Sequence, residues 1–287
     1  PTAPDSQLAR WPSTAHGGQP PHGFGGLSSV GRTTRIPNVG AMTDTTSRIP
    51  LARRIGWGWI ALSSLAIAAF AVVPYLTSSL QALGSGGAAL GAHYAQQPAW
   101  VQVVFYIHVV AGGIALVLGP FQFARGLRDR RPRVHRATGR VLVLAMLVAA
   151  AAGLTLAPVN SGGLVGALGF GSLAVLWGTF TILGFAAIRR RDVTSHRRWM
   201  IRAFALTYAA VTLRLWIPVL ILAQVPFGVP EADLFANAYA VVPFLCWVPN
   251  LIVAEFIARR AVTTTPATDR RVLGGSSRAR ALQHARG

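Results

Sequence analysis

The sequence predicts an all-α integral membrane protein, a bundle of six transmembrane helices with a parallel internal repeat of two helical hairpins. Three observations predict this fold. The 287 residues are 52% hydrophobic and only 12% charged, with a mean hydropathy of +0.46, whereas about 25% of the residues in soluble domains are charged. Six apolar runs have the length of a bilayer crossing. Of the five connections between these runs, only the second and the fourth contain basic residues.

The two ends of the chain have a different composition from its centre. Residues 1–41 mix Pro, Gly, Ser, Thr and Arg without periodicity, so we expect them to be disordered, because they offer too little apolar surface to offset chain entropy. One interpretation is that the natural protein starts at Met42. Residues 42–55 then form a cytoplasmic N-terminus, residues 56–260 the transmembrane domain, and residues 261–287 a disordered basic cytoplasmic tail.

The six predicted spans follow from apolar runs near the length of about 20 residues that crosses a bilayer core. The first run is too long for a typical signal peptide and has no small-residue cleavage site. The runs are Trp57–Leu80, Trp100–Phe123, Val141–Ala157, Val165–Ile188, Trp199–Ala223 and Ala236–Ala258.

Arginine placement predicts the orientation. All 27 basic residues are Arg, against 8 acidic residues. Arginines crowd the connections after the second and fourth runs, while residues 81–99, 158–164 and 224–235 contain none. The positive-inside rule therefore places both termini on the cytoplasmic side of a bacterial inner membrane. We expect these arginines to meet anionic lipid headgroups, and we expect no nucleic-acid partner because the charge is dispersed over short loops.

An internal repeat appears when the chain is shifted against itself by 61 residues. The shift superposes Arg128 on Arg189, His135 on His196 and Arg136 on Arg197. The second and third spans then form one hairpin and the fourth and fifth form another. Repeats of equal orientation are related by an axis near the membrane normal, so His135 and His196 are expected at one depth, each at the cytoplasmic start of a helix.

Polar residues inside the spans are the candidate ligand contacts. At a rise of about 1.5 Å per residue, His108 lies about 12 Å and Arg214 about 13 Å from the outer surface. No carboxylate shares the depth of Arg214, so its candidate partners are His108, a threonine, a backbone carbonyl or a bound anion. Glu255, in the last span, is expected to meet Arg198 or Arg202.

The last span is predicted to be kinked or locally unwound, because it contains Pro243 and Pro249. Two interpretations of the neighbouring Asn250 stay open. It lines a cavity together with carbonyl groups that the kink frees, or it hydrogen-bonds a neighbouring helix as part of ordinary packing.

Several strings of residues stand out along the spans and their connections. They are His108 with Gly119-Pro-Phe-Gln-Phe, His135-Arg with Gly139-Arg140, His196-Arg-Arg-Trp leading to Arg214, and Cys246-Trp-Val-Pro-Asn250 with Glu255. Together they resemble an uncharacterised family of bacterial polytopic membrane proteins known as domain of unknown function 2306. The similarity covers about residues 55 to 258. It implies a bacterial multi-pass membrane protein and no assigned reaction.

The first functional hypothesis is a polar pocket in the bundle that binds a small polar or anionic ligand or a lipid, in a carrier, sensory or lipid-binding role. No catalytic residue is predicted, because the sequence has no HExxH, GxSxG or paired intramembrane carboxylates. The candidate binding residues are His108, Arg214, Asn250 and Glu255 in the spans, and His135, Arg140, His196, Arg197 and Arg202 toward the cytoplasm.

The alternative is a membrane electron carrier that binds b-type haem through histidine axial ligands. Its candidate ligands are His135 with His196, or His108 with His93 from an outer loop, Arg214 serving a propionate. The inner pair sits at loop edges, and His108 has no second histidine inside a span. Histidines at such positions also cap helices or form hydrogen bonds with a neighbouring helix. The haem hypothesis therefore depends on an analogy of architecture with six-helix b-type cytochromes.

Overall fold

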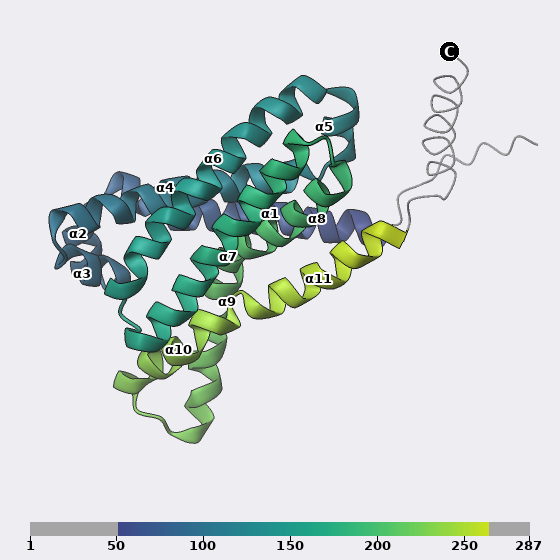
Figure 1. Ribbon diagram of the computed structural model, residues 1–287. Helices are drawn as coiled ribbons and strands as arrows, with labels where there is room; N and C mark the ends of the chain where they lie inside the picture. The colour runs from purple at the N-terminus through teal and green to yellow at the C-terminus, as the bar shows by residue number, and fades with distance from the viewer. Residues whose placement is uncertain (1–50, 264–287) are drawn as a thin grey trace, which may run out of the picture. The chain divides into compact units, whose positions relative to one another are not determined.

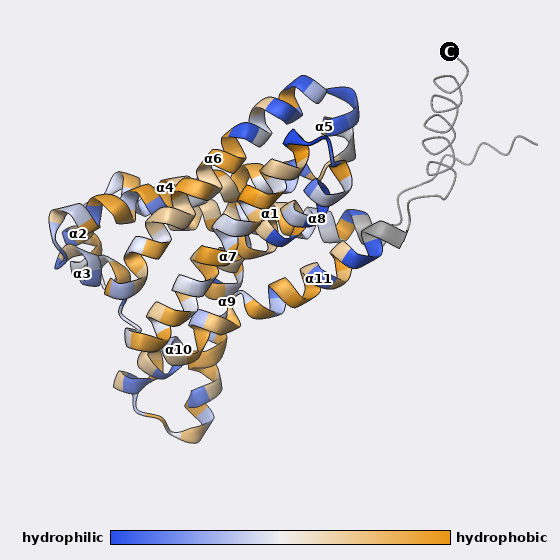
Figure 2. Ribbon diagram, in the orientation of Figure 1, coloured by the Kyte–Doolittle hydropathy of each residue, from blue (hydrophilic) through white to orange (hydrophobic). Residues whose placement is uncertain are grey.

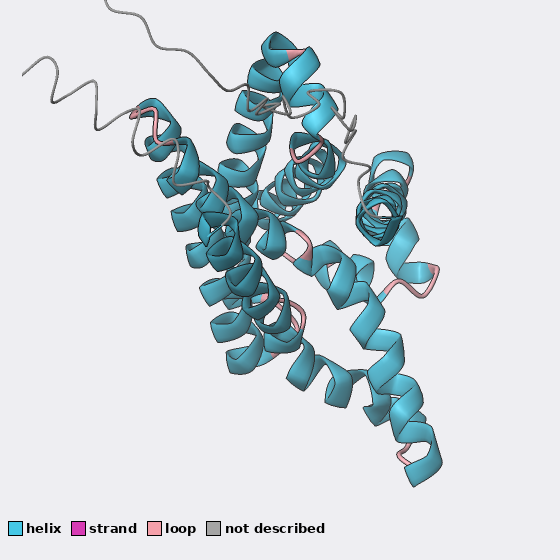
Figure 3. Cartoon of the chain, turned by 90° about the vertical axis from the view of Figure 1, so that its right-hand side faces the viewer, coloured by secondary structure: helices cyan, strands magenta, loops and turns pink. Residues whose placement is uncertain are grey.

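The computed structural model describes residues 51–263. The predictions of a disordered segment at 1–41 and a start at Met42 lie outside the described residues. So does the predicted tail at 261–287, except for residues 261–263, which are not disordered but continue α11. Within residues 51–263 the structure consists of helices and short connections, with no strand. Figure 3 shows this all-helical construction.

The described helices run in the following order. They are α1 (Leu51–Thr77), α2 (Leu80–Ser85), α3 (Ala89–Ala95), α4 (Ala99–Gln122), α5 (Arg125–Arg130), α6 (Pro132–Leu156), the 3-10 turn η1 (Ala157–Val159), α7 (Gly163–Arg189), α8 (Val193–Thr207), α9 (Ala209–Gln224), the 3-10 turn η2 (Val225–Phe227), α10 (Glu231–Leu245) and α11 (Val248–Thr263).

The six predicted spans are confirmed. Helical segments long and apolar enough to cross a membrane cover α1, α4, α6 with η1, α7, α8 to η2, and α10 to α11. Large apolar side chains such as Phe70, Leu168 and Phe256 lie exposed on the outside of these helices. In water this surface would be strongly unfavourable, so it is the surface that contacts the lipid bilayer.

Small residues form much of the packed interior. Helix α4 lies between α1 and α6, and α7 packs against both α6 and α8. Ala115, Ala149 and Ala203 are completely buried at these contacts, and such residues let transmembrane helices approach closely. Figure 1 shows the resulting arrangement, in which α10 pairs with α9 and α11 runs beside α8.

Polar residues gather at one end of the bundle. Figure 2 shows hydrophilic residues concentrated around α5 and the turn between α7 and α8, while α2 and α3 lie at the other end of α4. We call the first of these the arginine-rich end, after the sequence Arg-Gly-Leu-Arg-Asp-Arg of α5 and the arginines 189–191. The Arg-bearing connections thus lie together, as the alternating charge pattern requires.

The last two spans are both interrupted. Helix α10 ends at Leu245 and α11 starts at Val248, which confirms the interruption expected from Pro243 and Pro249. The fifth span was expected to be continuous from Trp199 to Ala223, but it divides into α8 and α9 at Tyr208. No proline lies at the Tyr208 break, which comes first along the chain. Asn250 of the last span instead donates to the Ala205 carbonyl beside it.

Candidate functional site

A cavity of about 230 Å³ lies inside the bundle. Its walls come from α1, α3, α4, α6, α7, α8, α9 and α10, so no single hairpin forms it. Several aromatic side chains contribute to these walls. They are Tyr75, Tyr94, Phe105, Phe170, Trp177 and Tyr239.

His108 lines this cavity from α4. Its Nδ1 atom lies 2.9 Å from the carbonyl oxygen of Ala149 on α6. A carbonyl oxygen only accepts, so Nδ1 carries the proton and Nε2 is left with a lone pair. Gly153 makes room for the ring, since a Cβ atom there would lie 3.0 Å from the His108 Cε1 atom. The imidazole is therefore held in one orientation at the cavity wall.

Arg214 lines the same cavity from α9, so the two polar residues expected at one depth do share one space. Its Nη1 atom donates to the carbonyl oxygen of Ala210 at 2.8 Å, one turn earlier in the same helix. Among residues 51–263, no Asp or Glu side chain forms an ion pair with Arg214. A backbone carbonyl satisfies one donor and leaves the positive charge without a counter-charge at membrane depth.

The two helix breaks adjoin the cavity. Thr207 and Ala209, on either side of the first break, line the cavity, and so does Cys246 from the second. The indole nitrogen of Trp177 donates to the Thr207 hydroxyl at 3.0 Å, and that hydroxyl donates to the Ala203 carbonyl at the same distance. Irregular backbone at membrane depth is tolerated where it is buried in protein or lines a cavity, and discontinuous helices are typical of transporter ligand sites.

Asn250 lies outside the set of residues that line the cavity. Its amide nitrogen lies 3.0 Å from the Thr212 hydroxyl, 3.1 Å from the Cys246 carbonyl and 3.3 Å from the Ala205 carbonyl. These contacts agree with the packing interpretation, because they join α11 to the helices before it.

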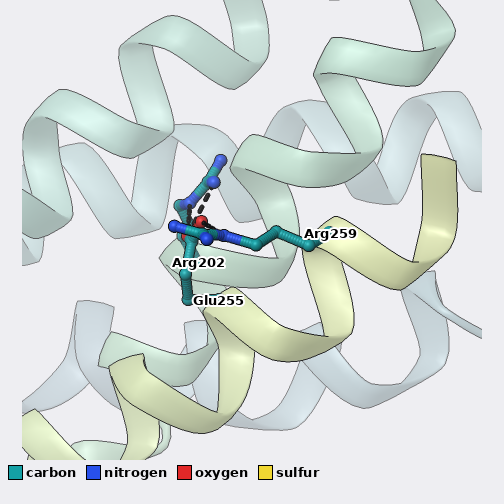
Figure 4. Close-up of polar contacts among 3 residues, drawn as sticks. All are labelled: Arg202, Glu255 and Arg259. Atoms are coloured by element: carbon teal, nitrogen blue, oxygen red, sulfur yellow. Dashed lines mark hydrogen bonds and ion pairs between the residues drawn. The ribbon is translucent and has the colours of Figure 1, made fainter.

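Glu255 pairs with Arg202, one of its two expected partners, and also with Arg259 (Figure 4). Arg202 Nη2 and Arg259 Nε each lie 2.7 Å from a different carboxylate oxygen. The side chain of Arg202 is 11% exposed and that of Arg259 is 73% exposed. Arg202 also lies over the Trp199 ring, 4.7 Å from its centroid. The two arginines together outweigh the one carboxylate, so this cluster keeps a net positive charge, and none of its residues lines the cavity.

The remaining predicted site residues lie at the arginine-rich end. His196 is fixed by its Nδ1 atom, 2.8 Å from the Gly184 carbonyl of α7. His135 is partly buried, whereas Arg140 and Arg197 are exposed. The structure therefore brings only His108 and Arg214 together in the cavity.

The aromatic lining of the cavity was not predicted from the sequence. Tyr94 stacks on Phe105 with ring centroids 4.2 Å apart, and burial raises the pKa of its hydroxyl to about 12. Tyrosines near the ends of apolar runs were the available signal, but such residues also occur as ordinary membrane-interface anchors. Only the packing of α3 against α4 reveals that Tyr94 faces inward.

The cavity does not present the two histidines that bis-histidine haem ligation requires. His108 is the one histidine in its lining, and His93 instead places Nε2 2.7 Å from the Val159 carbonyl. Across residues 51–263 there is also no cluster of three or more His, Cys, Asp or Glu side chains arranged to hold a metal ion.

Comparison with known proteins identifies one family. A family model described as "Predicted membrane protein (DUF2306)" matches residues 105–258, more than half of the chain. The match runs from α4 to α11 and includes His108, Arg214, Asn250 and Glu255. No curated protein and no solved structure matches the chain.

Proposed function

The chain belongs to the DUF2306 family of predicted membrane proteins, and from this premise we propose that its internal cavity binds a small anionic ligand with an apolar body. The observation that carries the proposal is the side chain of Arg214. It lines the cavity and has no carboxylate partner in the described part of the chain.

Charge compensation is the first supporting argument. An arginine inside a membrane domain is costly unless another group offsets its charge, by about 2.5 to 3.5 kcal/mol on insertion scales. The Ala210 carbonyl accepts one hydrogen bond but carries no net charge. The planar guanidinium matches the two oxygens of a carboxylate or two oxygens of a phosphate. A bound anion in the cavity therefore supplies the missing counter-charge.

The walls indicate the rest of the ligand. Six aromatic side chains line the cavity, and aromatic and apolar linings of this kind favour an apolar ligand body, with a few polar groups fixing its orientation. Arg214 and His108 are these polar groups. We infer a fatty acid or another small amphiphilic acid. A carrier, a sensor and a lipid-binding protein share this binding step.

We also propose the orientation and the symmetry of the bundle. The positive-inside rule supports a bacterial inner-membrane location with the arginine-rich end and both termini in the cytoplasm. His135 and His196 are each the fourth residue of their helices, α6 and α8. These equivalent positions support the parallel repeat of two hairpins. Cysteine-accessibility labelling of residues 81–99, after replacement of Cys246, tests the orientation; labelling from the cytoplasm would contradict it.

Ligand binding is tested with the full chain purified in detergent. Octanoate serves as the probe and octanol as its uncharged equivalent, with the midpoint of thermal stabilisation as the readout. We expect octanoate to stabilise the protein much more than octanol. Arg214→Gln should weaken octanoate binding at least about tenfold, the equivalent of 1.4 kcal/mol, and Arg214→Lys should weaken it less.

Arg140→Gln is the matched control, because Arg140 is exposed and does not line the cavity. Equal stabilisation by octanol, or unchanged octanoate binding by Arg214→Gln, would reject the proposal. The absorption spectrum of the same preparation tests the haem alternative. A Soret band that His108→Ala removes would replace the anionic ligand with haem.

A further inference from the structure

The N-terminal turns of α6 and α8 hold one histidine each at the arginine-rich end. His135 and His196 occupy the same position in their helices, and they lie close enough to influence each other electrostatically. The His196 ring is anchored by its bond to the Gly184 carbonyl. Because Nδ1 is the donor in that bond, Nε2 is the ring nitrogen left for another partner.

The His135 ring has an unsatisfied atom. Its Nδ1 is buried and has no hydrogen-bond partner among the described residues. Leaving a buried polar atom unpaired costs about 1 to 3 kcal/mol, and more when the group is charged. Within residues 51–263 only three other side-chain atoms share this condition, and one of them is Nε of Arg198 at the same end of the bundle. Both atoms belong to side chains that donate to anions.

The surroundings of His135 are positively charged. The strongest electrostatic influences on its ring come from Arg128, His196 and Arg136. Arg128 also forms an exposed ion pair with its neighbour Asp129, with 3.2 Å between its Nε and the carboxylate. The N-terminus of α6 has no side-chain cap, unlike that of α8, where Asp192 accepts from the Ser195 amide. The positive end of the α6 dipole and its uncapped amides therefore add to the attraction for an anion.

We propose that the first turn of α6, with His135, His196, Arg128 and Arg136, binds a phosphate group. A phosphate carries up to two negative charges and several acceptor oxygens, so it can accept from the uncapped amides and from more than one cationic side chain at once. The phosphate comes either from the headgroup of an anionic phospholipid or from a soluble phosphate compound. This site is separate from the cavity and does not depend on its ligand.

The experiment uses the detergent-purified full chain and two probes, dioleoyl phosphatidylglycerol and inorganic phosphate. Dioleoylglycerol, which has the same chains and no phosphate, is the reference lipid. We expect phosphatidylglycerol or inorganic phosphate to raise the melting temperature, and dioleoylglycerol to leave it unchanged. Stabilisation by phosphatidylglycerol alone identifies a lipid headgroup as the source, and stabilisation by inorganic phosphate identifies a soluble one.

The variants test the assigned residues. Replacing His135 and Arg136 together by Gln should raise the midpoint concentration of the stabilising probe at least about tenfold. Arg128→Gln changes an exposed position and should not disturb the core. It should also raise the midpoint concentration of the stabilising probe. Replacing Arg189 and Arg190 by Gln is the matched control, because it removes positive charge from the same end. The proposal is wrong if neither probe stabilises the protein, or if the control variant loses as much affinity as the site variants.

Discussion

The amide nitrogen of Asn250 lies 3.0 Å from the hydroxyl oxygen of Thr212, and this hydrogen bond joins α11 to α9 between the two helix breaks. The Thr212 hydroxyl in turn donates to the Cys246 carbonyl at the second break. Asn250 also reaches the Ala205 carbonyl beside the first break. Side chains thus satisfy carbonyl groups near both interruptions, as buried backbone at membrane depth requires.

Asn250→Ala is expected to lower the free energy of unfolding by about 1 kcal/mol, since polar contacts between transmembrane helices average about 0.6 and reach about 1.7 kcal/mol. Unfolding in mixed micelles with increasing dodecyl sulfate measures this change. Asn237→Ala is the control, because Asn237 is exposed and its amide bonds only to Gln224. Equal losses in the two variants would contradict the role assigned to Asn250.

Gly169 is expected to tolerate no larger residue, because a Cβ atom there would lie 2.6 Å from Pro243 Cβ and 2.9 Å from the Pro243 carbonyl. Gly169→Ala forces α7 away from α10 and should cost about 1 to 3 kcal/mol, the usual range for overpacking. Gly171→Ala meets only Ala157 at an ordinary 3.7 Å and should be close to neutral. Thermal unfolding in detergent compares the two, and a neutral Gly169→Ala would refute this contact.

The two arginines that share Glu255 should contribute unequally. The largely buried Arg202 bonds Glu255 through both Nε and Nη2, whereas Arg259 is mostly exposed and one turn away on the same helix. An exposed pair of that type contributes about 0.3 to 0.5 kcal/mol, and the Arg202 pair should exceed this. Double-mutant cycles with Glu255→Gln measure both couplings. A larger coupling for Arg259 would contradict the effect of burial.

Asp192, at the start of α8, should make the stability of the folded protein depend on pH. Its carboxylate accepts hydrogen bonds from Ser195, including one of 2.9 Å from the backbone amide, and these bonds lower the pKa of Asp192 below its ordinary value of 3.8. Because the pKa of Asp192 is lower in the folded state, its carboxylate stabilises the fold at pH values above its ordinary pKa. This stabilisation is lost as the pH falls through the pKa of the folded state.

The melting temperature of the wild-type protein should therefore fall more than that of Asp192→Asn between about pH 5 and about pH 3. Asn is the suitable replacement, because it retains an acceptor for the Ser195 amide and does not titrate. Parallel pH profiles for the two proteins would show that the Asp192 charge does not contribute.

Much of the fold follows from hydropathy and charge alone. The six spans were predicted because a bilayer crossing needs a long apolar run, and proline placement predicted the interruption near Cys246. The break at Tyr208 was missed because its local sequence contains no proline or glycine. The sequence also left Arg198 and Arg202 as alternative partners for Glu255, since both lie in the same stretch of α8. Packing of α11 against α8 selects Arg202.

The sequence by itself determined how far along its predicted span each polar group lies, because a helix has a constant rise per residue. It thereby predicted that His108 and Arg214 lie at one level. Only the tertiary structure decided which way each side chain faces and what it meets, because these depend on the rotation and packing of several helices. The aromatic wall around Arg214 comes from residues far apart in the chain, and so does the absence of a carboxylate partner among the described residues. No single segment of the sequence contains that information.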